Sequence, residues 1–479
     1  MNTQLDLPES SGAAWSLGKL LENRVLRSTL KLVLGLGAAG IVVVAAAAIY
    51  NAFDEDLSPQ AKALLVPPPM GKIDDSNGYI AFLGLVAPAG QDPMAWGRKA
   101  AVALAEQSDP GFTRTADWRE ATRPHLTVNA TAWCKPDCLA EVKRDPATVA
   151  ARLANGTNAQ LLERYRKLRD TPDFADLDFG AFNTGASASY SALAAGASLS
   201  LGDAALKANA GDAAAAIGEL EQELKFHRRL MSGGRTLATV MNGETLLGRD
   251  LLAIAQLLRS DAKRFAPFVA SLRELTSAEV SDAGIAAALR WTAHERVSWA
   301  QQWKTLLVLA GLPSANWFTS WLIQPNATAN LVAQVMSAEI SLGAASAAQF
   351  EPERAAVRKA NDALVERPWY AEASNPVGKS LTELATGALG EYVARWHDLR
   401  ALARMVDLQL ALAERGIGEP AAIAAFVSGE EAKSHVDSYT GKPFAFDPAT
   451  RLLSYLPHAE SRWSSDLKKR YAGRVAIEL

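Results

Sequence analysis

The sequence predicts a mainly α-helical protein that is anchored in a membrane near its N-terminus and carries a small β-hairpin near its C-terminus. Three observations support this fold class. Residues 32–50 form an uncharged apolar run, apolar residues recur three and four positions apart through much of 73–428, and short alternating segments between turns are confined to 429–479. With 479 residues and 49% hydrophobic content, the chain can bury a large core.

The apolar run at 32–50 is predicted to be a transmembrane helix, because nineteen helical residues reach about 28 Å and a bilayer core is about 30 Å thick. Basic residues precede the run and acidic residues follow it: Arg24, Arg27 and Lys31, then Asp54, Glu55 and Asp56. This charge pattern places residues 1–31 in the cytoplasm and the rest across the membrane. A cleaved signal peptide is the alternative, although its apolar core usually spans about 7–15 residues.

The residue usage suggests a bacterium with a GC-rich genome, because Ala, Gly, Leu and Arg are abundant. We therefore expect a single-pass inner-membrane protein with a periplasmic C-terminal domain. The net charge is −3 and the basic residues are dispersed, so nucleic acid is not an expected partner. The expected partners are the inner membrane and another protein or a second copy of the chain.

Residues 51–72 are predicted to form a proline-rich spacer. Three consecutive prolines, Pro67, Pro68 and Pro69, favour a stiff extended segment that holds the folded part away from the membrane.

The two cysteines, Cys134 and Cys138, are predicted to pair with each other, because the periplasm is oxidising. The intervening Lys-Pro-Asp suits a tight turn before a helix. A redox-active pair is the alternative, but the spacing is C-x3-C rather than C-x-x-C. A zinc site lacks further ligands at a usual spacing, so no metal or other cofactor is expected.

Residues 73–428 are predicted to form a helical periplasmic domain. Helical spacing and end signals predict the following helices: one capped by 74–76 and running through Leu83, then 93–105, 217–231, 240–258, 299–310 and 389–413. The Ser/Ala/Gly-rich segment 184–202 suits either a flexible loop or a small-residue helix. Two subdomains with a break near 171–202 are the alternative to one continuous domain. The long stripe in 389–413 is expected to pack against neighbouring helices or another chain.

Residues 387–456 resemble a tail module of bacterial envelope proteins in which a long helix precedes a hairpin with the motif D-P-[FY]-[ST]-G-K-P-[LF]-x-[YF]. Here Asp437 to Phe446 read DSYTGKPFAF, with Ser438 at the usual proline position. The segment has a looser likeness to the C-terminal strands of type II secretion pseudopilins. In those proteins the helix continues the membrane anchor, whereas here more than three hundred residues separate the two. The resemblance implies a packing device on an envelope protein.

Common catalytic motifs are missing from the sequence, including the nucleophile elbow, the P-loop, the dinucleotide-binding turn and H-E-x-x-H. Of the six histidines, His227 shares a helix face with Glu223, but it lies on an apolar stripe and is interpreted as a core residue. His397 is interpreted as a structural histidine. The candidate catalytic residues are His294 and Glu295, which share a helix with two tryptophans.

Five tryptophans lie in the segment 291–321, where exposed indoles can bind sugar rings or a partner's side chain. Trp299 and Trp303 are one helical turn apart and are assigned to packing. Trp317 and Trp321 lie at the edge of the helical pattern and are the candidate binding residues.

Taken as a whole, the sequence favours an envelope scaffold or accessory interaction subunit. The alternatives are a periplasmic enzyme that acts on cell-wall or glycan substrates through His294, and a helical sensor domain.

Overall fold

In the computed structural model, the described residues are those of 24–479 other than 52, 70, 107–114, 116–118, 121–124, 126–136, 178–185, 278–281, 310–323, 366–374, 376–377, 381, 383–388 and 462. These residues form a mainly helical protein with a three-stranded antiparallel sheet close to the C-terminus. The predicted fold class is confirmed to that extent. The sheet has one strand more than the predicted hairpin.

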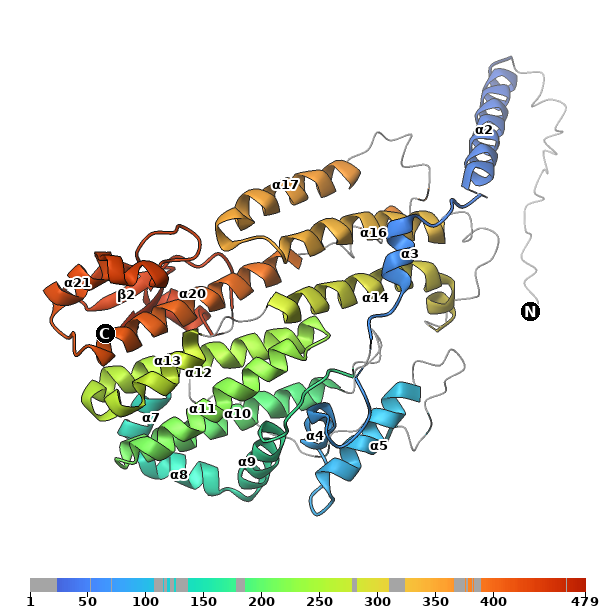
Figure 1. Ribbon diagram of the computed structural model, residues 1–479. Helices are drawn as coiled ribbons and strands as arrows, with labels where there is room; N and C mark the ends of the chain where they lie inside the picture. The colour runs from blue at the N-terminus through green and yellow to red at the C-terminus, as the bar shows by residue number, and fades with distance from the viewer. Residues whose placement is uncertain are drawn as a thin grey trace, which may run out of the picture.

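Helix α2 (Arg24–Asn51) contains the segment that was expected to span a membrane, and it projects away from the rest of the molecule (Figure 1). Eight of its large apolar side chains are exposed, each by 45–72%: Leu30, Leu32, Val33, Leu34, Leu36, Ile41, Val42 and Ile49. Across the described residues, no helix has both the length and the apolar character needed to cross a membrane. The predicted transmembrane helix at 32–50 is therefore not shown by the structure.

The segment after α2 is not a free-standing spacer. It contains α3 (Pro59–Leu65), which is capped by the Ser58 hydroxyl and packs against α14 (Asp282–Leu309) and α16 (Pro325–Leu342). Ala61 of α3 is completely buried. Residues 53–68, which we name the strap, therefore run along the helical body instead of holding it at a distance.

The helical body begins with α4 (Gly78–Gly84) and α5 (Pro93–Glu106), two short helices that pack together. Both agree with the predicted positions, but Asn77 is the N-cap of α4, in place of residues 74–76. The next helices are α7 (Cys138–Arg144), α8 (Pro146–Ala154), α9 (Gly156–Arg169) and α10 (Ala186–Asn209). Helix α10 covers most of the Ser/Ala/Gly-rich segment and decides that ambiguity in favour of a helix.

Helix α12 (Leu237–Phe265) lies at the centre of the body, where it contacts α10, α11 (Ala213–Ser232), α14 and α20 (Leu389–Glu414). The apolar stripes of α11, α12 and α20 follow the predicted spacing and are buried in one core. The stripe of α20 is thus covered by helices of the same chain, and it no longer indicates a partner chain. The remaining helical elements are η1 (Ala266–Phe268), α13 (Val269–Ser277) and α17 (Ala347–Val365).

Residues 429–479, which we name the C-terminal module, follow α21 (Pro420–Ser428) and contain η2 (Glu430–His435), β1 (Ala445–Asp447), β2 (Leu452–Tyr455), α22 (Ser465–Arg470) and β3 (Val475–Glu478). The antiparallel strand order is β1-β2-β3, with Leu453 opposite both Phe446 and Ile477. The module lies at the opposite end of the body from α2 (Figure 1).

Candidate functional site

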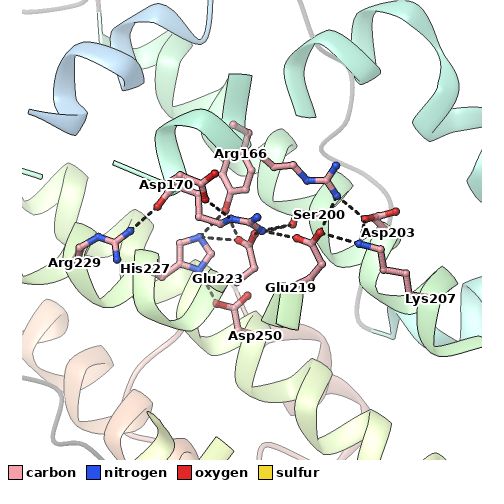
Figure 2. Close-up of polar contacts among 12 residues, drawn as sticks. Arg166, Asp170, Ser200, Asp203, Lys207, Glu219, Glu223, His227, Arg229 and Asp250 are labelled. Carbon is pink, nitrogen blue, oxygen red and sulfur yellow. Dashed lines mark hydrogen bonds and ion pairs between the residues drawn. The ribbon is translucent and has the colours of Figure 1, made fainter. Parts of the chain in front are cut away.

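The most concentrated set of ionisable groups lies inside the helical body, between α9, α11 and α12 (Figure 2). Glu223 and His227 are one turn apart on α11, Asp250 comes from α12 and Tyr165 from α9. The side chains of these four residues, which we name the buried cluster, have no significant contact with solvent. Acids and histidines are seldom so deeply buried unless they have polar partners, so the contacts of each one matter.

The histidine of the buried cluster is bonded at both ring nitrogens. His227 Nδ1 lies 2.6 Å from Asp250 Oδ2, and its Nε2 lies 3.0 Å from the hydroxyl of Tyr165. The same hydroxyl donates a hydrogen bond to Glu223, which also accepts one from Ser200 at 2.7 Å. A hydroxyl, an imidazole and a carboxylate in this order are the parts of a general-base relay, but burial separates them from any substrate in the medium.

One buried and two partly exposed cations balance the acids of this region. Arg169 Nη1 lies 2.6 Å from Glu219 and 3.0 Å from Glu223, and Arg166 and Lys207 also contact Glu219 (Figure 2). Burial tends to raise the pKa of Glu219, but the hydrogen bonds from Lys207 and Arg169 outweigh it and lower this pKa to about 2. Glu219 therefore stays ionised in the folded protein and holds the three cations together.

Asp250 is in a different electrostatic situation. Burial raises the pKa of its carboxyl to about 6, and the charge and hydrogen bond of His227 offset only part of that rise. Its second oxygen, Oδ1, is buried, and no residue in the described part of the chain forms a hydrogen bond with it. A change in the protonation of His227 or Asp250 would therefore change the stability of the folded protein.

Glu223, His227 and Asp250 offer metal-ligand atoms that lie within 4.8 Å of one another. Both nitrogens of His227 are already in hydrogen bonds, and the guanidinium of Arg169 lies against Glu223. A divalent cation would have to displace these contacts and share the site with a positive charge. The donor set fits a closed hydrogen-bond network better than a metal centre.

The sequence candidate His294 lies on α14, where it contacts the strap. Its half-buried ring donates from Nδ1 to the carbonyl oxygen of Leu64 over 2.8 Å, and burial lowers its pKa, so it is neutral at pH 7. Trp291, one turn earlier on α14, is covered by the guanidinium of Arg235, whose Cζ is 3.5 Å from the ring centroid. Glu295 is partly buried on the same helix. The contacts of this region serve to hold residues 53–68.

Several sequence candidates lie outside the described residues, namely Trp317, Trp321 and Cys134. Cys138 is buried at the start of α7, and its pairing with Cys134 stays a prediction. Trp299 was assigned to packing, and this is wrong, because its side chain is 47% exposed on α14.

The motif near the C-terminus builds a turn and then attaches it to α20. Asp437 accepts hydrogen bonds from the backbone amide of Tyr439 and the hydroxyl of Thr440, and Gly441 takes the positive φ of +64° that this turn requires. The turn presents the hydroxyl of Tyr439 to Asp398 Oδ1 of α20, at 2.8 Å. The motif thus packs the turn against α20.

The C-terminal module contacts α12 through a second buried acid. Glu244 Oε1 accepts hydrogen bonds from Trp463 Nε1 at 2.6 Å and from the Ser461 hydroxyl at 2.9 Å. Gly248, one turn along α12, leaves the space for the indole, because a Cβ there would lie 2.6 Å from Trp463 Cγ. Burial raises the pKa of Glu244 to about 7 and that of Asp398 to about 6.

No family model, curated protein or solved structure matches this chain. The functional assignment therefore depends on the contacts described above. Sequence spacing revealed the pair Glu223 and His227, because both lie on one helix face. It gave no signal for Tyr165 and Asp250, which other helices bring to the same point.

Proposed function

We propose that this protein is a membrane-anchored scaffold of the bacterial envelope, with α2 as its anchor and the helical body as the part that meets a protein partner. The observation that carries the proposal is the row of eight exposed large apolar side chains on α2. They do not join the core, whose first member along the described chain is Ala61 of the strap. Exposed apolar side chains that have no protein cover favour an apolar environment.

The energy available from such an environment is large. Complete transfer of one large aliphatic side chain from water to an apolar phase stabilises by about 1.5–3 kcal/mol, so eight give on the order of 10–20 kcal/mol. Lys31 lies before the apolar segment and Asp54, Glu55 and Asp56 lie after it. This order supports a cytoplasmic N-terminus and a periplasmic body, with the chain crossing the inner membrane once.

The internal chemistry supports a scaffold over a hydrolase. His227 and its acids form a closed network, His294 holds the strap, and His435 is paired with Asp407 at 2.7 Å. His397 is buried, neither of its ring nitrogens has a hydrogen-bond partner among the described residues, and burial lowers its pKa to about 4. These four histidines have structural positions, and a general base needs access to substrate.

Alkaline carbonate extraction of membranes that contain the full-length chain tests the anchor. We expect the wild-type chain to stay in the pellet and the double variant Leu36→Arg/Val42→Arg to move to the supernatant, since each arginine costs about 2.5–3.5 kcal/mol at a bilayer centre. Val102→Arg is the matched control, because Val102 is also an exposed apolar residue, 49% exposed on α5. Release of the intact wild-type chain would refute the anchor.

The scaffold role is tested separately by the mass of the solubilised particle. Crosslinking in native membranes, followed by mass measurement of the purified complex, should give more than the 51.1 kDa of one chain. A monomer that cleaves cell-wall fragments, and loses this activity with His294→Ala, would replace the scaffold with the enzyme hypothesis.

A further inference from the structure

The first turn of α16 is capped by a residue far away in the sequence. The backbone amides of Asn326 and Ala327 donate to Asp54 Oδ2 and Oδ1 over 2.7 and 3.0 Å. Gln324, the residue before α16, makes no side-chain cap of its own, and its amide nitrogen instead donates to the carbonyl of Phe53 at 2.9 Å. An aspartate at this position satisfies free amides and complements the positive end of the helix dipole.

The covalent chain fixes how far this cap can be from the end of α2. Asp54 follows Asn51, the last residue of α2, by three positions. Three residues span at most about 10 Å even when fully extended. Wherever α2 ends, the first turn of α16 must therefore lie close by.

Further contacts attach the strap to three helices of the body. Asn330 of α16 donates to the side chain of Glu55 at 2.7 Å and accepts from the backbone amide of Ser58 at 2.7 Å. His294 of α14 and Arg235, at the start of α12, bond the carbonyls of Leu64 and Pro68. Contacts at successive points along different helices resist rotation about any single bond of the strap.

We propose that the strap holds the body in one orientation against the bilayer, with the start of α16 and helix α3 facing the lipid headgroups and the C-terminal module pointing away. The ligand of this face is the surface of a phospholipid bilayer. This inference rests on the proposed membrane anchor, and it adds that the body does not swing freely on its anchor. In Figure 1, α3 lies beside the start of α16 on the side of α2, and α21 lies at the far end.

The test places a fluorophore, through a genetically encoded amino acid, at one of two exposed positions in the full-length chain. Gln60 lies on α3 and Ser428 on α21. The protein is reconstituted into phosphatidylethanolamine/phosphatidylglycerol vesicles that contain a lipid with a nitroxide headgroup. We expect the label at 60 to be quenched several-fold more strongly than the label at 428.

The double variant Asp54→Ala/Asn330→Ala removes the cap and the amide clamp, and it should reduce this difference several-fold. Asn330→Asp is the milder variant, and it should weaken the difference because the carboxylate cannot donate to Glu55. Asp145→Ala is the matched control, since Asp145 caps α8 through the amide of Thr148 and does not contact the strap. Circular dichroism checks that each variant is folded.

The outcomes separate the two proposals. If the wild-type chain fails to float with the vesicles, the anchor itself is refuted. If it floats but the two labels are quenched equally, or the double variant keeps the full difference, the anchor stands and the fixed orientation is overturned.

Discussion

The strap and the C-terminal module both attach a distant part of the chain to the helical body, but they use contacts of opposite kinds. The strap is joined through exposed or half-buried hydrogen bonds, many of them to backbone groups, as between Asp54 and the amides of Asn326 and Ala327. The module is joined through carboxylates that have no contact with solvent, Glu244 and Asp398. The comparison indicates that many hydrogen bonds, each with a small effect on stability, attach the strap. A few buried contacts, each with a large effect on stability, attach the C-terminal module.

The largest effect on the free energy of unfolding is expected at the buried cluster. Glu223→Ala leaves Arg169 with one acid fewer in a solvent-excluded site, and it should lower the free energy of unfolding by about 3–5 kcal/mol. Glu163→Ala, which removes an exposed partner of Lys167, should cause no measurable change. Chemical denaturation of the purified chain measures both, and an equally small effect of the two variants would show that the cluster is not a stabilising network.

At the C-terminal module, the expected signature is a pH dependence. The folded-state pKa of Glu244 is about 7 against an unfolded value of 4.5, so its contribution is present below pH 4.5 and is lost as the pH rises through 7. The total change is about 3 kcal/mol. Glu244→Gln cannot ionise and should be the more stable form at pH 8 but not at pH 4.5.

Denaturation curves at a series of pH values measure this difference. Glu430→Gln serves as control, since that residue is exposed in the same module, and it should leave the pH profile unchanged. If the stability of wild type and of Glu244→Gln depended on pH in the same way, ionisation of Glu244 would not destabilise the folded protein.

At the strap, the expected effect is small and local. Asp54→Ala should destabilise the first turn of α16 by about 1 kcal/mol, the usual value of a helix cap, which accelerates hydrogen exchange there about fivefold. Exchange in the α8 segment should not change, whereas Asp145→Ala should reverse this pattern. A loss of global stability from Asp54→Ala would contradict the distinction between the two ends.

Helical periodicity predicted α4, α5, α11, α12 and α20, because the apolar stripe of each helix is a local feature of the sequence. It did not locate helices such as α9, α16 and α17. The sequence also located the turn at Asp437 and Gly441 through residue types that the turn itself requires. It missed β3 and the packing of the strap, since pairing partners such as Ile477 and Leu453 lie far from obvious turn signals. The three prolines were interpreted as a spacer because composition does not reveal that Arg235 bonds to Pro68.

The candidate site was harder to predict for the same reason. Glu223 and His227 are visible as an i, i+4 pair, but the identity of their partners depends on how α9 and α12 pack. His294 stood out for its aromatic neighbours, and the structure uses it to bond the carbonyl of Leu64. The sequence therefore indicated that these histidines and acids have polar roles, but the partners of each side chain depend on how the helices pack.

Protease access from the two sides of the inner membrane tests the central claim most directly. In spheroplasts that contain the full-length chain with a C-terminal epitope, added protease should remove the epitope, and in inverted vesicles the same epitope should be protected. The opposite pattern, or an intact chain recovered in the soluble fraction, would contradict a body that α2 holds on the periplasmic face.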